Sequence, residues 1–366
     1  MKNIVIFSNP FGSGPAGKAI SIAQYITDHS NPKEVTVFMC GSEQLRSIVG
    51  NRFPFIEVNE RDEIEILKAL DSIDGSKYII SSQNRFPIRA ARARNIPCAF
   101  LDGLAWFWKT IPEEHFIADI IFWLNYPNIA DKIPALHKEK IKIVHGITEE
   151  ITVPQEIKRN NDILLYLGGC KNPLTQLPTN YLDLFAALID FVTDRGTEIH
   201  VSTDTESQEY LKKYPVTFSR IHRFEHEQFI SKLLHVKKFI TNGGQTATME
   251  ALSTQTPISF FLPGNLSQMA LINNINVSEK QPCLEWHNYV EIPKDIFDCN
   301  EKDAIMFFDQ RSKELLKNKE ALDRLCNDFL HLLNNDQETK PSVFLKNLGS
   351  TGTQDIYAIL KNAWGI

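Results

Sequence analysis

The chain has 366 residues, of which 43% are apolar and 23% are charged, and its formal net charge at pH 7 is -6. Single hydrophobic cores stop growing at roughly 250–300 residues, so the length predicts two domains. The composition excludes a disordered or collagen-like chain. The excess of acidic residues provides no basic field that would hold nucleic acid.

The cysteines are scattered, without a C-x-x-C pair. They are Cys40, Cys98, Cys170, Cys283, Cys299 and Cys326. This pattern indicates free thiols in a reducing compartment, so we expect a cytoplasmic protein with neither a disulfide framework nor a zinc site. The most apolar region, residues 96–126, is interrupted by charged residues such as Asp102 and Lys109, so no membrane-spanning helix is expected there. The apolar run near Met1 is too short for a signal peptide.

The first half of the chain alternates short apolar runs with helical patterns. Residues 3–8 predict a buried strand, a glycine-rich loop covers 9–17, and a helix follows over 18–29. Further strands are predicted at 35–39, 78–81, 98–101 and 120–124, with a helix at 61–72. Strands that alternate with helices indicate parallel β-α-β units.

The pattern stops in the polar segment 145–161, which we interpret as a linker, and then starts again. The second half predicts strands at 162–167, 198–202, 238–241 and 258–262, and helices at 181–195, 225–235, 246–253, from 267, 312–334 and 354–363. We therefore predict an α/β protein with two Rossmann-like, doubly wound domains that face each other across a ligand-binding cleft. Their expected ranges are 1–150 and 162–350, with a C-terminal helix at 354–366 that packs back on the first domain.

Residues 239–274 carry the clearest chemical pattern. A strand leads into Asn242-Gly243-Gly244, and a helix begins near Thr246. Two glycines allow a ligand to approach the backbone closely. The unpaired N–H groups at the start of a helix, together with the helix dipole, favour a phosphate.

Two polar side chains follow this turn at regular distances. Glu250 falls about one turn into the helix, where a carboxylate can accept hydrogen bonds from a ribose diol. Gln268 follows Pro263 in a second loop-to-helix turn, where its amide can bind sugar hydroxyls. The composite pattern is G-G-x-T-x-x-x-E, then proline, then glutamine. The alternative is a structural turn in a non-catalytic Rossmann-like domain.

This segment resembles the nucleotide-sugar signature of GT-B glycosyltransferases, both the UDP-glycosyltransferase type and the MurG-like group. The resemblance implies that Gly244, Gln245, Thr246 and Ala247 donate hydrogen bonds to a diphosphate. It also implies that Glu250 holds the ribose, that Gln268 contacts the donor sugar, that Gly168 and Gly169 face the pyrophosphate and that Phe224 flanks the uracil. Asn242 stands where many family members have a histidine, so the phosphate contact there is altered.

The first half is expected to bind the acceptor. The loop with Gly12, Ser13 and Gly14 resembles the N-terminal glycine-rich loop of the same superfamily, but it lacks the histidine that many members use as a base. Asp102 is the candidate base, because it follows a strand and lies among aromatic residues that exclude water. An equally good interpretation is an aspartate that caps the next helix.

Three tryptophans, Trp106, Trp108 and Trp123, lie within eighteen positions. They can line an acceptor pocket for a flat ring, dock peripherally on a membrane or pack in the core, and core packing is the commonest role. Arg85, Arg89 and Arg92 form one stripe of a helix, either for an anionic acceptor or as a solvated face.

The resemblance implies a glycosyltransferase that passes a sugar from a UDP-sugar to a small acceptor, with no bound metal or cofactor. A fainter similarity to cytosylglucuronate synthases implies cytosine as the acceptor and UDP-glucuronate as the donor. The alternatives are a UDP-sugar 2-epimerase of the same fold and a non-catalytic, donor-binding partner subunit. The sequence does not specify the sugar, the stereochemical outcome or the oligomeric state.

Overall fold

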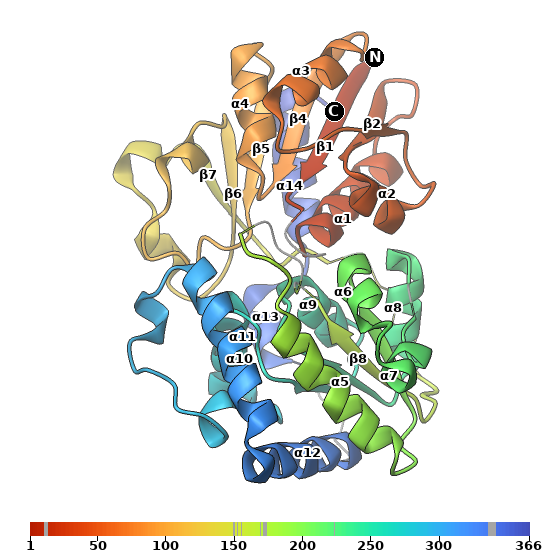
Figure 1. The fold of residues 1–366 in the computed structure, drawn as a ribbon. Coiled ribbons are helices and arrows are strands. Elements are labelled where there is room, and N and C mark those ends of the chain that lie inside the picture. Colours follow the sequence, from red (N-terminus) through yellow and green to blue (C-terminus); the bar gives the residue numbers. More distant parts are fainter. Residues whose placement is uncertain are drawn as a thin grey trace. The chain divides into compact units, whose positions relative to one another are not determined.

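The computed structural model describes residues 1–10, 14–148, 151, 153–154, 156–168, 170, 174–222, 224–335 and 342–366. The chain divides into two compact units. The N-terminal unit comprises Met1–Pro10, Pro15–Ile151 and Leu345–Ile366, and the C-terminal unit comprises Phe11–Gly14 and Thr152–Phe344. Figure 1 shows that each unit has its own sheet flanked by helices.

The N-terminal unit is built on a parallel sheet with the strand order β3-β2-β1-β4-β5-β6-β7 in the described residues. The strands are β1 (Lys2–Ser8), β2 (Val35–Gly41), β3 (Phe55–Glu57), β4 (Ser76–Ser82), β5 (Cys98–Asp102), β6 (Ile120–Leu124) and β7 (Ile141–Val144). The order reverses between β1 and β4. In doubly wound sheets the carboxyl ends of strands near such a reversal are the usual place for ligands.

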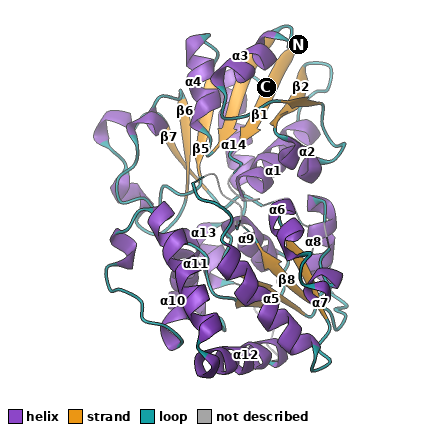
Figure 2. Ribbon diagram, viewed as in Figure 1, coloured by secondary structure: helices purple, strands orange, loops and turns teal. Residues whose placement is uncertain are grey.

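Helices flank this sheet (Figure 2). They are α1 (Gly14–His29), α2 (Glu43–Val49), α3 (Glu63–Asp71), α4 (Arg85–Ala93) and α14 (Gly352–Trp364), with short 3-10 helices η1 (Glu113–Phe116), η2 (Ile129–Lys132) and η3 (Ala135–His137). Side chains of α3 and α4, including Ile66 and Ile88, share one buried cluster with Val5, Ile79 and Phe100 of the strands.

The C-terminal helix α14 belongs to the N-terminal unit. Tyr357 of this helix donates a hydrogen bond to the carbonyl of His29 at 2.6 Å. Trp364 lies with its ring centroid 5.1 Å from that of Tyr78 on β4. This helix is therefore held by aromatic packing and by a side-chain hydrogen bond to a main-chain carbonyl of the first unit.

The C-terminal unit has a parallel sheet with the order β11-β10-β8-β9 across its described part. The strands are β8 (Ile163–Leu167), β9 (Ile199–Thr203), β10 (Lys238–Thr241) and β11 (Ile258–Phe260). The helices are α5 (Thr179–Thr193), α6 (Thr205–Leu211), α7 (Pro215–Ser219), α8 (His226–His235), α9 (Gln245–Ser253), α10 (Leu266–Glu279), α11 (Glu301–Lys317), α12 (Lys319–Asn334) and α13 (Val343–Leu348), with η4 (Trp286–Asn288) and η5 (Ile296–Asp298).

Local sequence explains where several helices begin. The side chains of Asp62, Asn84 and Asn265 accept hydrogen bonds from first-turn amides of α3, α4 and α10. Such caps satisfy N–H groups that have no partner inside the helix. The predicted single helix at 312–334 is wrong, because Asn318 leaves the helical conformation and caps α12 through Ala321 N.

The predicted doubly wound α/β fold class is confirmed, with parallel strands in both units. Each predicted strand is present, with its ends shifted by a few residues at most. The short elements β3, β7 and α2 were not predicted. Their few residues carry too little periodicity to be distinguished from loops.

Candidate functional site

The turn between β10 and α9 is shaped by two glycines with different constraints. Gly243 has φ of +88°, and a methyl group added there would lie 2.9 Å from Ile272 Cγ1 and 3.0 Å from the carbonyl oxygen of Gln268. A side chain at this position would therefore clash with α10. At Gly244 an added methyl group would meet no atom within 4 Å, so space is open beside its backbone.

Helix α9 starts at Gln245, directly after Gly244 at the N-cap position. Glycine has no side chain that could cap the helix, whereas α3, α4 and α10 have side-chain caps. The first-turn N–H groups of α9 point out of the N-terminal end of the helix, as they do in any α-helix. They lie beside the open space at Gly244 and carry the positive end of the helix dipole, which is the arrangement that binds phosphate groups.

Two predicted donor residues meet at the end of β8. The side-chain amides of Asn242 and Gln268 both donate to the carbonyl oxygen of Gly168, at 2.9 and 3.1 Å. Gln268 Oε1 also accepts from Gly264 N at 2.7 Å. Both side chains are buried. These amides join β8, β10 and α10 at the level of the glycine turn.

Glu250 lies on α9 and is 2% exposed, and it pairs with a residue that the sequence did not single out. Nε2 of His226, at the start of α8, lies 2.5 Å from Glu250 Oε1. His226 is itself only 7% exposed. A histidine from a neighbouring helix therefore fixes the conformation of the carboxylate predicted to bind ribose.

The other predicted donor residues are distributed around this turn. Thr246 Oγ1 donates to the carbonyl oxygen of Gly14, which is counted with the C-terminal unit, at 2.8 Å. Ala247 is buried on α9. Phe224 stacks on His222, and burial lowers the pKa of that histidine. Gly12, Ser13 and Gly169 lie outside the described residues.

In the N-terminal unit, Asp102 is the last residue of β5 and is 2% exposed. Its Oδ1 accepts hydrogen bonds from Leu104 N at 3.0 Å and from Trp108 Nε1 at 3.4 Å. Its Oδ2 lies 2.8 Å from Nδ1 of His115 on η1. Asp102 thus stabilises the turn that follows it and also holds a histidine.

His115 is a candidate functional residue that the sequence interpretation missed. It comes thirteen positions after Asp102, in a segment without a recognisable motif. The sequence feature that could have identified it is a histidine shortly after the strand that ends at Asp102. Polar residues near the carboxyl edge of a parallel sheet often lie close together.

The aromatic turn after Asp102 is packed and hydrogen-bonded. Trp106 stacks on Tyr126 with centroids 4.5 Å apart. The ammonium of Lys132 donates to the carbonyl oxygens of Trp106 and Trp108, at 2.7 Å each. Burial lowers the pKa of Lys132, while the charge of Asp102 opposes this effect. Trp123 is fully buried in the core, as expected for the commonest role of tryptophan.

The arginine stripe on α4 is engaged in ion pairs. Arg85 and Arg89 both pair with Glu114 on η1, and Arg92 pairs with Asp119 at 2.6 Å. These contacts tie α4 to the segment that carries His115. The stripe therefore has a structural partner on its own unit.

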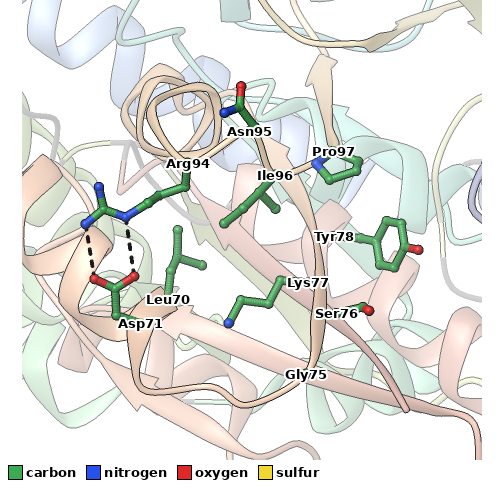
Figure 3. A pocket seen from close by; sticks show the side chains of 10 residues that line it. All are labelled: Leu70, Asp71, Gly75, Ser76, Lys77, Tyr78, Arg94, Asn95, Ile96 and Pro97. Atoms are coloured by element: carbon green, nitrogen blue, oxygen red, sulfur yellow. Dashed lines mark hydrogen bonds and ion pairs between the residues drawn. The ribbon is translucent and has the colours of Figure 1, made fainter.

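A pocket at the other edge of the N-terminal sheet is not a good candidate site (Figure 3). It lies at the amino ends of β4 and β5 and is lined by residues such as Lys77, Tyr78 and Pro97. Arg94 and Asp71, which line it, neutralise each other in a bidentate ion pair. The pairing lowers the pKa of Asp71.

Three properties of the described residues bear on the function class. The six cysteines are free, in agreement with the prediction. Across the described ranges, no group of three or more His, Cys, Asp or Glu residues is arranged to hold a metal ion. None of the helices in the described part of the chain has the length and apolarity needed to cross a membrane.

No protein-family model matches the sequence, and no curated protein matches it. In structure, the chain is similar to MnaA from S. aureus solved with UDP, with a TM-score of 0.51 and 13% identity over 100% of this chain and 97% of that one. The chain is also similar to MurG from Acinetobacter baumannii, with a TM-score of 0.45 and 11% identity over 99% of this chain and 100% of that one. For a proposed UDP-N-acetylglucosamine 2-epimerase from Listeria monocytogenes, the TM-score is 0.48 and the identity is 14%, over 100% of this chain and 96% of that one.

The similarity to the MnaA complex covers the whole chain and concerns its fold. Together with the two parallel sheets, it confirms the predicted GT-B fold with two Rossmann-like units. At 13% identity the similarity shows the fold and does not extend to the roles of individual residues.

Proposed function

We propose that the protein is a glycosyltransferase that moves a sugar from a UDP-sugar to a small acceptor, with the donor bound by the C-terminal unit. The observation that carries this proposal is the start of α9. Its first-turn amides adjoin open space at Gly244, and Glu250 lies on the same helix. The fold shared with a protein that was solved with UDP supports the same conclusion.

The diphosphate would bind at the amides of Gln245, Thr246 and Ala247. Preorganised N–H groups and the helix dipole stabilise the negative charge that develops on the leaving UDP as the sugar departs. This role requires no metal ion, so we expect a metal-independent enzyme. The close packing of Gly243 against α10 keeps the turn in position.

The ribose would bind at Glu250. Glu250 lies six positions after Gly244, which is roughly 9 Å along a helix axis, a span that the diphosphate and ribose of UDP can bridge. His226 occupies Oε1 of the carboxylate. Two carboxylate oxygens offer about four acceptor positions, so capacity remains for ribose hydroxyls.

The acceptor would bind to the N-terminal unit, near the carboxyl end of β5. The aromatic turn with Trp106 and Trp108 suits a flat ring, and cytosine with UDP-glucuronate is the narrower hypothesis. In the transfer, the acceptor atom forms a bond to the anomeric carbon. The bond from that carbon to the diphosphate oxygen breaks, and the electron pair leaves with UDP.

A UDP-sugar 2-epimerase is the second candidate, because the fold alone does not separate this reaction from sugar transfer. Mass spectrometry of products formed from UDP-glucose, UDP-N-acetylglucosamine or UDP-glucuronate, with and without cytosine, separates the two. A glycosylated acceptor supports transfer, whereas an isomerised UDP-sugar supports epimerisation. UDP binding without either product supports a non-catalytic partner subunit.

Titration calorimetry with UDP tests the donor site. Glu250→Ala should weaken binding by about 2 kcal/mol, roughly 30-fold, because charge-assisted hydrogen bonds to the ribose are lost. Glu227→Ala is the matched control, since Glu227 is an exposed carboxylate next to His226 on α8. Equal UDP affinity in the wild type and Glu250→Ala would refute the ribose role, and no binding by the wild type would refute the donor site.

A further inference from the structure

The N-terminal unit contains a histidine–carboxylate pair whose geometry suits proton transfer. Asp102 Oδ2 lies 2.8 Å from His115 Nδ1. The carboxylate is 2% exposed, and the His115 side chain is 14% exposed. Within the described residues, Nε2 of His115 has no hydrogen-bond partner. The carboxylate of the pair is therefore buried, while Nε2 is available to accept a proton.

The chemistry of the pair determines the tautomer of His115. An ionised carboxylate only accepts hydrogen bonds, so Nδ1 must be the ring nitrogen that carries the proton. In the neutral imidazole, Nε2 then holds a free lone pair. Two further donors, Leu104 N and Trp108 Nε1, contact the other oxygen of Asp102, so both carboxylate oxygens are hydrogen-bonded.

Contacts around η1 fix the position of His115. Glu114, the preceding residue, is held by both Arg85 and Arg89 of α4. Phe116, the following residue, stacks on His137 with ring centroids 4.3 Å apart. The His115 ring also lies 5.0 Å from the ring of Phe100 on β5. A side chain anchored on both sides loses little freedom when it acts on a substrate.

We infer that His115 is the general base of the proposed transfer, and that Asp102 is the residue that positions it and stabilises its charged form. Nε2 takes the proton from the acceptor's O–H or N–H group as the acceptor atom bonds to the anomeric carbon, and UDP leaves with the electron pair. The imidazolium that forms is stabilised by Asp102. This inference rests on the proposed transferase function, and it supplies a base in a chain whose loop at 11–17 has no histidine.

The test compares His115→Gln with His137→Gln, which removes a histidine that packs on the same segment but does not contact Asp102 in any described hydrogen bond. Turnover is measured as UDP release from UDP-glucose, UDP-N-acetylglucosamine or UDP-glucuronate with cytosine or water as acceptor. UDP affinity is measured in parallel. His115→Gln should lower kcat by about 100-fold or more, since a general base contributes roughly 10²–10⁴-fold. UDP affinity should change less than about twofold, and His137→Gln should keep wild-type turnover.

A purely structural histidine would give a different pattern. Loss of a structural contact would lower kcat and UDP affinity together, whereas loss of the base lowers kcat alone. Wild-type turnover in His115→Gln would overturn the inference and leave the proposed function standing.

A measurement without substrate keeps the inference testable if no panel sugar is turned over or if the variant misfolds. The ¹⁵N spectrum of the histidine-labelled wild type should show His115 protonated at Nδ1 and unprotonated at Nε2. A proton on Nε2 would overturn the role as base. Absence of UDP binding by the wild type would instead overturn the proposed donor site.

Discussion

The two units each contain a buried carboxylate paired with a histidine, and the two pairs differ in the ring nitrogen that they use. In the N-terminal unit, Asp102 contacts Nδ1 of His115 at 2.8 Å, and Nε2 has no partner in the described residues. In the C-terminal unit, Glu250 contacts Nε2 of His226 at 2.5 Å. His115 is 14% exposed and His226 is 7% exposed.

This difference separates two chemical roles for the same pair of residue types. A histidine anchored through Nδ1 presents its outer nitrogen as a base, with the carboxylate behind it. A histidine whose Nε2 is used to hold a carboxylate has its outer nitrogen occupied, so that pair is suited to fixing the carboxylate for ligand binding. The first pair is therefore expected to affect turnover, and the second to affect UDP affinity.

Replacing each carboxylate by its amide sharpens this comparison most strongly. In Asp102→Asn, the amide can donate to Nδ1 and move the histidine proton to Nε2, so kcat should fall by about 100-fold with UDP affinity unchanged. In Glu250→Gln, UDP affinity should fall by roughly 10-fold, because charge-assisted hydrogen bonds become neutral ones. UDP titration and steady-state kinetics on both variants check this, and identical effects of the two changes would break the distinction.

Glu301, a half-buried carboxyl at the start of α11, should make the stability of the protein depend on pH. Burial raises its pKa to about 7, and hydrogen bonds from Ser267 and Leu266 oppose this only in part. The folded state thus holds a proton that the unfolded state releases, so the unfolding free energy should fall as pH rises from about 4.5 to 7.

Glu301→Gln should remove this dependence. The unfolding free energy of the variant minus that of the wild type should increase by about 2–3 kcal/mol when the pH is raised from 5 to 8. Urea unfolding at several pH values measures it. A stability difference between the two proteins that is the same at pH 5 and pH 8 would contradict the assigned burial effect.

The two glycines of the β10–α9 turn should differ in what their replacement affects, since Gly243 is required for stability and Gly244 for UDP binding. Gly243→Ala should destabilise the protein by about 1–3 kcal/mol, because its φ is +88° and the added methyl group meets Ile272 and the Gln268 carbonyl. Gly244→Ala should keep the melting temperature, since the space there is open, but should weaken UDP binding by several-fold. Thermal melts and UDP titrations check both, and unchanged UDP affinity in Gly244→Ala would contradict phosphate binding beside this residue.

The fold and the donor turn were predictable because their signals are local. Strand periodicity, the glycine pair and the helix start all lie within a few residues of Gly244, and the structure has α9 beginning one residue before the predicted position. The side-chain pairs were not predictable in the same way. His115 meets Asp102, and His226 meets Glu250, through packing between separate elements, and no residue spacing specifies which nitrogen makes the contact.

The helix at 312–334 was predicted wrongly for a related reason. The apolar pattern continues across Asn318, where the backbone leaves the helical conformation and the side chain caps the next helix, so periodicity alone does not reveal the break. Asp102 illustrates the same limit. Its position at a strand end was predicted, but its three hydrogen-bond partners come from the following turn, from Trp108 and from η1.

A crystal structure of the protein with UDP tests the central claim most directly. The account predicts that the diphosphate contacts the main-chain amides at Gln245–Ala247, beside Gly244, and that the ribose hydroxyls contact the Glu250 carboxylate. A nucleotide bound elsewhere, with no contact to the start of α9 or to Glu250, would contradict the proposed donor site and leave only the fold assignment in place.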